Sequence, residues 1–195
     1  MDGNSAMRRY INTGAAAKNA VNAIRYSQNN LDGPRPGTLP SSAMAGYRFV
    51  TNWRLDAPVA AVWEEINHSE RWPQWWQSVL AVVELQKGDE TGVGSVRRYT
   101  WRGALPYKLT FDMRTTVVEK HARLEGVATG ELSGHGCWTF AGQGSVTTVR
   151  YDWEVDANKA WMRLLSPIAR PLFEWNHDIV MNRGLEGLTS RLVRR

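Results

Sequence analysis

The feature that most restricts the fold of this chain is a run of six segments in which apolar and polar residues alternate. They occupy residues 80–86, 95–101, 107–119, 123–129, 134–141 and 147–155. Alternation with a period of two is typical of β-strands that bury one face. The connections are short and rich in turn residues, for example at 87–89 and 142–144, so consecutive strands pair antiparallel. We therefore predict an antiparallel meander.

Helical patterns stand on either side of the meander. A first strand is predicted from Tyr47 to Leu55, followed by one short helix after Pro58 and a second from Asn67 that contains three tryptophans. Residues 158–193 read as a long helix, which the prolines at 167 and 171 must break or kink. This order predicts an α+β helix-grip fold, in which a seven-stranded curved antiparallel sheet surrounds the C-terminal helix and encloses a space.

The first 46 residues differ from the rest. They hold many small and amide residues, few acids, and a turn-rich stretch at 32–37. We interpret residues 1–46 as an N-terminal extension, partly flexible or forming a docking helix, and residues 47–195 as the ligand-binding domain. A transit peptide and a start at Met44 are the alternatives.

Charge and cysteine content restrict the function. The net charge of +5 is spread over the chain, whereas nucleic-acid binders concentrate basic residues on one element, so no nucleic-acid partner is expected. The arginines at 191, 194 and 195 leave a transient membrane contact open. With Cys137 alone, no apolar leader and no apolar run of about 18 residues, the expected location is the cytoplasm.

The alternation of residues along the predicted strands indicates that the sheet has one polar face and one aromatic face. A single helix seldom fills the concavity of a seven-stranded sheet, so we interpret the aromatic face as the lining of a cavity, although each ring alone is more typical of a core. Rings of the second short helix and His177 of the long helix are added to this lining. The predicted ligand-binding residues are Trp72, Trp76, Tyr99, Trp101, Phe111, Met113, Trp138, Phe140, Tyr151, Trp153 and His177.

The long helix has two apolar stripes. One contains Leu172 and Trp175, and the other contains Phe173, Met181 and Gly184. One stripe should face the sheet, with Gly184 allowing a close approach, and the other should meet the short helices, the N-terminal segment or a partner subunit. The oligomeric state and the stripe that lines the cavity are not determined by this pattern.

Several kinds of chemistry find no support in the sequence. The four histidines are scattered and no spacing matches a metal site, the Gly92-Val93-Gly94 turn precedes a strand instead of a helix, and no serine lies in a hydrolase elbow. We therefore expect no metal and no other cofactor.

Three stretches carry a family resemblance, namely residues 136–140, 149–155 and 171–178. Together with the order of elements, they resemble the polyketide cyclase/dehydrase and lipid-transport family, a branch of the START and Bet v 1-like (SRPBCC) superfamily. The resemblance covers residues 47–193. It implies the helix-grip fold and a cavity, and it leaves open whether the protein is a carrier or an enzyme.

Three functions follow as hypotheses. The first is binding or transport of a small hydrophobic ligand, such as a lipid, a quinone, a polyketide or another aromatic molecule. The second is a cyclase or dehydratase without metal or nucleotide, in which Arg97, Tyr99 or His177 polarises a carbonyl or moves a proton. The third is a protein-interaction module that uses the basic C-terminus. The aromatic, weakly charged cavity favours the first.

Overall fold

A computed structural model describes residues 46–194, and the side chains of all of these except residues 160–169. This part lies within the compact unit Met44–Arg195. The expectations for residues 1–45 lie outside the described residues. No helix among the described residues is long and apolar enough to cross a membrane.

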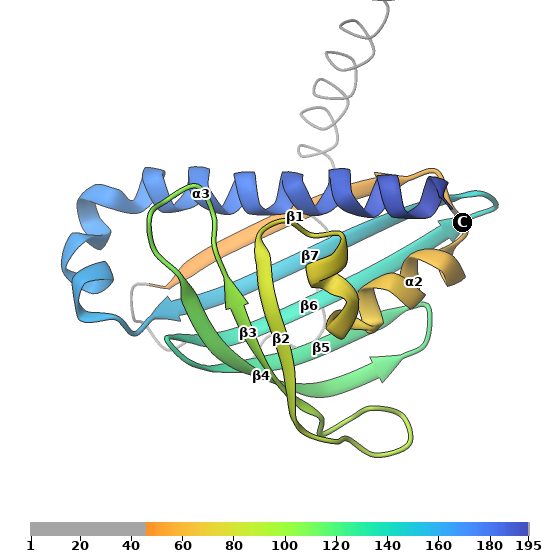
Figure 1. Ribbon diagram of the computed structural model, residues 1–195, viewed down its shortest axis with the longest axis horizontal. Coiled ribbons are helices and arrows are strands. Elements are labelled where there is room, and N and C mark those ends of the chain that lie inside the picture. Colours follow the sequence, from red (N-terminus) through yellow and green to blue (C-terminus); the bar gives the residue numbers. More distant parts are fainter. Residues whose placement is uncertain (1–45, 195) are drawn as a thin grey trace, which may run out of the picture. The chain divides into compact units, whose positions relative to one another are not determined.

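Seven strands form one antiparallel sheet that curves below the long helix (Figure 1). Their order in the sheet is β1-β7-β6-β5-β4-β3-β2, so the meander predicted from the alternating segments is present and the first strand adds to its far end. The strands are β1 (Tyr47–Leu55), β2 (Val79–Gln86), β3 (Val96–Trp101), β4 (Leu109–Glu119), β5 (Arg123–Gly130), β6 (Leu132–Gln143) and β7 (Val146–Ala157).

Within residues 46–194, three helical elements accompany the sheet. The short helix α2 (Val59–Asn67) leads into the 3-10 helix η1 (Ser69–Gln74), and α3 (Ala160–Val193) lies along the concave side of the sheet (Figure 1). The second short helix ends earlier than predicted, so Trp75 and Trp76 follow it. Pro73 lies inside η1 and has no N–H to extend the helix. The disruption expected at Pro167 and Pro171 takes the form of a bend near the start of a continuous α3 (Figure 1).

The two faces of the sheet are those predicted from alternation. On the concave face Tyr99 lies opposite Phe111, and Trp138 lies opposite Tyr151, on neighbouring strands. The convex face carries ion pairs instead, including one between Arg98 and Asp112 at 2.7 Å. Aromatic side chains therefore gather between the sheet and α3.

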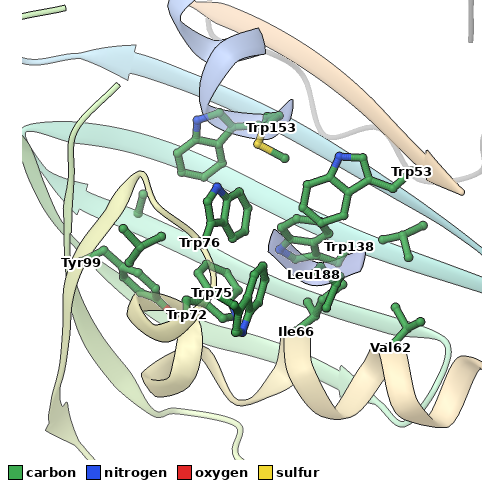
Figure 2. Packing of buried hydrophobic residues seen from close by; sticks show 14 of the residues in the cluster. Trp53, Val62, Ile66, Trp72, Trp75, Trp76, Tyr99, Trp138, Trp153 and Leu188 are labelled. Carbon is green, nitrogen blue, oxygen red and sulfur yellow. The ribbon is translucent and has the colours of Figure 1, made fainter. Parts of the chain in front are cut away.

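Tryptophans form the centre of the core (Figure 2). The ring of Trp76 lies 5.4 Å from that of Trp53 and 5.0 Å from that of Trp72, measured between centroids. Trp53 also lies 5.4 Å from Trp138. Because these rings come from β1, β6 and the segment around η1, their packing fixes η1 against the sheet.

The long helix approaches this cluster through a glycine. Nε1 of Trp76 donates a hydrogen bond to the backbone oxygen of Val180 at 2.8 Å, and a Cβ at Gly184 would collide with the Trp76 ring. The close approach at Gly184 is therefore to Trp76, in the segment that follows η1, and not to the sheet as predicted. Phe173 of the same stripe does contact the sheet, because its ring lies 5.8 Å from that of Tyr47 on β1. In the other stripe, Leu172 and Trp175 are exposed, at 45% and 50%, whereas Ile179 is half-buried.

Candidate functional site

An internal chamber of about 400 Å³ lies between η1 and the concave face of the sheet. We call it the large chamber. Alternation along β3, β4, β6 and β7 turns every second side chain toward it. At one end it is bounded by exposed residues of the β2–β3 connection, such as Asp89 and Thr91, so it reaches the surface there. Its aromatic lining consists of Trp72, Tyr99, Trp101, Phe111, Trp138 and Tyr151.

Three polar side chains meet in the wall of the large chamber. The Tyr99 hydroxyl donates a hydrogen bond to Oγ of Ser69 at 2.7 Å, and Nη1 of Arg97 donates to the same oxygen at 3.3 Å. Arg97 also donates to the backbone oxygen of Asn67 at 3.4 Å. A hydroxyl oxygen has two lone pairs, so both acceptor positions of Ser69 are used and its own proton remains available to a ligand.

The protonation of Tyr99 follows from its surroundings. Burial raises the pKa of Tyr99 above its ordinary value, and the hydrogen bond to Ser69 and the charge of Arg97 oppose this effect. Burial also raises the pKa of Tyr151 well above its ordinary value. Both phenols are therefore neutral near pH 7. The proton of Tyr99 is donated to Ser69, so the Ser69 hydroxyl and the Arg97 guanidinium are the groups of this set that can donate to an oxygen acceptor on a ligand.

Charged residues stand on the outer side of Arg97. Its Nη2 lies 3.9 Å from a carboxylate oxygen of Glu70 and 4.0 Å from one of Glu84. His68 lies between Glu64 and Glu70, at 3.1 and 3.0 Å. All of these side chains are at least one-third exposed except that of Arg97. The large chamber thus has an aromatic interior and a charged rim.

A second chamber of about 140 Å³ lies nearer to α3. We call it the small chamber. Phe49 of β1, Val155 of β7 and Met181 of α3 contribute to its mainly apolar lining. The ring of His177 also borders it and stacks on Phe49, with centroids 4.1 Å apart. The Nδ1 atom of His177 is 3.8 Å from the Asp178 carboxylate, which is too long for a hydrogen bond.

The predicted site residues divide between these chambers. Arg97 and Tyr99 meet in the large chamber, whereas His177, the third catalytic candidate, lies in the small one. Trp76 and Phe140 border neither chamber, because both are packed in the core. Of the other predicted residues, Trp72, Met113 and Trp138 line the large chamber, Trp153 lines the small chamber, and Trp101, Phe111 and Tyr151 line both.

The comparisons with known proteins agree with this architecture. The family of polyketide cyclases/dehydrases and lipid-transport proteins matches residues 48–193, which is most of the chain. The chain belongs to this family. No curated protein matches the sequence.

Solved structures of other proteins share the fold of this family member. The Zhui aromatase/cyclase from Streptomyces has a TM-score of 0.64 at 15% identity, over 77% of this chain and 95% of that chain. A START superfamily protein from Mycobacterium smegmatis has a TM-score of 0.63 at 12% identity, over 75% and 97%. A norcoclaurine synthase from Thalictrum has a TM-score of 0.52 at 10% identity, over 79% and 98%. At such identities the likeness establishes the fold alone.

Sequence reasoning missed two polar residues of this family member's site. Ser69 stands in the sequon Asn67-His68-Ser69, which indicates no role in a cavity, and it joins Arg97 and Tyr99 because η1 lies over β3. Asn176 is buried on α3, where its Oδ1 accepts hydrogen bonds from the backbone N–H groups of Ala104 and Leu105 at 2.8 and 3.1 Å. Within the described part of the chain, no three His, Cys, Asp or Glu side chains are grouped to hold a metal ion.

Proposed function

We propose that the large chamber binds a small aromatic or polyketide-like molecule that carries a carbonyl or hydroxyl oxygen. The observation that supports this most is the hydrogen-bonded group of Arg97, Ser69 and Tyr99 in a wall rich in aromatic rings. The rings provide apolar contact, and Arg97 and the Ser69 hydroxyl provide donors for the oxygen. Family membership supports the same class of ligand.

The expected affinity follows from surface burial. A two-ring ligand that buries about 300 Å² of apolar surface gains on the order of 7 kcal/mol before the cost of association. A hydrogen bond to a charged group adds about 1.5 to 3 kcal/mol. After an association cost of at least about 4 kcal/mol, roughly 4.5 to 6 kcal/mol remains, which corresponds to a Kd of tens to hundreds of micromolar. Binding should be stronger for an oxygen-bearing ligand than for the corresponding hydrocarbon.

The test uses 2-naphthol and naphthalene as probes in isothermal titration calorimetry with the full chain. We expect 2-naphthol to bind more tightly, and Arg97→Met to weaken its binding about 10- to 100-fold. Arg98→Met is the matched control, because Arg98 is the next residue of β3 and pairs with Asp112 on the convex face. If both variants bind 2-naphthol as the wild type does, the proposed role of Arg97 is wrong. If neither probe binds the wild type, the proposed function is wrong.

A second candidate is catalysis of ring closure in the same chamber. It is favoured by the proximity of Arg97 to Ser69, whose hydroxyl oxygen accepts the Tyr99 proton, since Arg97 and the Ser69 hydroxyl could both polarise the carbonyl under attack. Ring closure would form one C–C bond and move a proton from carbon to the carbonyl oxygen. Loss of that hydroxyl as water, together with a proton from the neighbouring carbon, forms a C=C bond, and enolisation of the remaining ring ketones then gives the aromatic phenol. The test is the appearance of phenol absorbance from a synthetic poly-β-ketone, which Arg97→Met should abolish.

A further inference from the structure

The two chambers are separated by a wall that they share. Trp101, Phe111 and Tyr151 border both of them. At these positions, the rings of these three residues separate the two chambers. A ligand that displaces such a ring would enter the second chamber directly.

A row of nearly parallel rings passes from one chamber to the other along the floor of the sheet. Trp138 borders the large chamber, Tyr151 borders both, and Trp153 borders the small chamber. The Tyr151 ring stacks on Trp138 with centroids 4.0 Å apart and planes inclined by 19°, and it stacks on Trp153 at 5.8 Å and 20°. Such a row offers continuous apolar contact to a long molecule.

A glycine makes this arrangement possible. A Cβ at Gly136 would lie 2.7 Å from the Tyr151 hydroxyl oxygen and 2.9 Å from the Trp153 ring. Any larger residue at this position of β6 would push both rings away from the floor. The row therefore depends on the strand that carries Gly136 as well as on β7.

The two chambers differ in chemistry. The large chamber contains the donors Arg97, Ser69 and Tyr99. In the small chamber, Asn176 already accepts two backbone hydrogen bonds through Oδ1, and His177 lies flat against Phe49. An apolar cavity of roughly 150 Å³ accepts a benzene-sized group, and the small chamber has about this size.

We propose that the two chambers form one divided site for an elongated ligand with a polar and an apolar end. Its oxygen-bearing ring end lies in the large chamber against Arg97, and its alkyl or phenyl end crosses Tyr151 into the small chamber. This inference rests on the proposed function, since it assigns the ring end to the site described there. The ligand class is thereby narrowed to aromatic molecules with an apolar side chain.

The test is a series of 2-naphthols that carry n-alkyl chains of zero to six carbons at the position opposite the hydroxyl, titrated calorimetrically into the full chain. Affinity should rise about fourfold for each CH₂ that becomes buried. Val180→Phe, which fills the small chamber, should abolish this dependence on chain length. Ile179→Phe is the matched control, because the preceding residue does not border that chamber, and it should keep the dependence. Phe173→Trp is a second filling variant if Val180→Phe does not fold.

The outcomes separate the two proposals. Tight binding of 2-naphthol with no gain from longer chains would overturn the divided site and leave the proposed function intact. A gain from longer chains that survives in both filling variants would also overturn the divided site and leave the proposed function intact. Failure of every probe to bind the wild type would overturn both proposals. One bound molecule per chain and a length dependence lost only in the filling variants would support the divided site.

Discussion

Replacing Asn176 by alanine should loosen the β3–β4 connection above the small chamber. The Oδ1 atom of Asn176 holds the backbone N–H groups of Ala104 and Leu105 at 2.8 and 3.1 Å. The connection is close to α3 here, because a Cβ at Gly103 would collide with the Asn176 side chain. Two hydrogen bonds at about 0.5 to 1.5 kcal/mol each amount to roughly 1 to 3 kcal/mol. This corresponds to an opening equilibrium about 5- to 150-fold larger.

Amide hydrogen exchange measures that equilibrium. In Asn176→Ala, we expect hydrogen exchange of the Ala104 and Leu105 amides to accelerate about 5- to 150-fold. The β3 amides should keep their protection. Asn176→Asp retains an acceptor oxygen and should restore protection. Asn182→Ala, at an exposed position of the same helix, is the control and should change nothing. Unaltered exchange in Asn176→Ala would refute the reasoning, as would equal exchange in the alanine and aspartate variants.

Three further predictions concern the packing around the site. Gly184→Ala should lower the free energy of unfolding by about 1 to 2 kcal/mol in urea denaturation, because its Cβ collides with the Trp76 ring; an increase in stability would mean that this ring can move. Arg191→Met should cost about 1 to 3 kcal/mol in the same assay, since Arg191 lies 3.5 Å from the fully buried carboxylate of Glu65. Burial raises the pKa of Cys137 from 9.0 to about 12, so iodoacetamide should alkylate the folded protein at pH 8 about a thousandfold more slowly than a free thiol.

The sheet and its two faces could be predicted because both follow from local rules. Side chains alternate along a strand whatever the rest of the chain does. Tyr99 and Arg98 are neighbours in the sequence, yet one is buried at 8% exposure and the other pairs with Asp112 on the convex face. The long helix was predictable from the spacing of its apolar residues. Its closely packed side was predictable as well, since Gly184 marks the side on which a close contact is possible.

The division of the interior into two chambers could not be predicted, because it depends on contacts between distant segments. Trp76 was expected to line a cavity, but it lies against Gly184, a residue far along the chain. His177 was grouped with Arg97 because both lie on faces that point inward. Rings at positions 101, 111 and 151 stand between the spaces that these two residues border. Periodicity assigns a residue to a face and does not give its depth along that face.

Whether the large chamber holds its ligand or transforms it depends on where a proton can go. Ring closure requires a base, and burial keeps Tyr99 neutral, with its pKa raised above the ordinary value. The carboxylate of Glu84 lies 4.0 Å from Nη2 of Arg97 and borders the same chamber, so it is a group beside Arg97 that could take up a proton there. His68, Asp89 and Glu90 also border the chamber.

Glu84→Gln therefore separates the two functions. If the protein is an enzyme, this change should lower kcat at least tenfold and leave the Kd for 2-naphthol unchanged, because Arg97 and Ser69 still hold the oxygen. Glu154→Gln, the same change at an exposed position outside the chamber, is the control for altered charge. Equal turnover in Glu84→Gln and the wild type would exclude Glu84 as the base. The absence of turnover in both, with 2-naphthol still bound, would leave ligand binding as the function of the chamber.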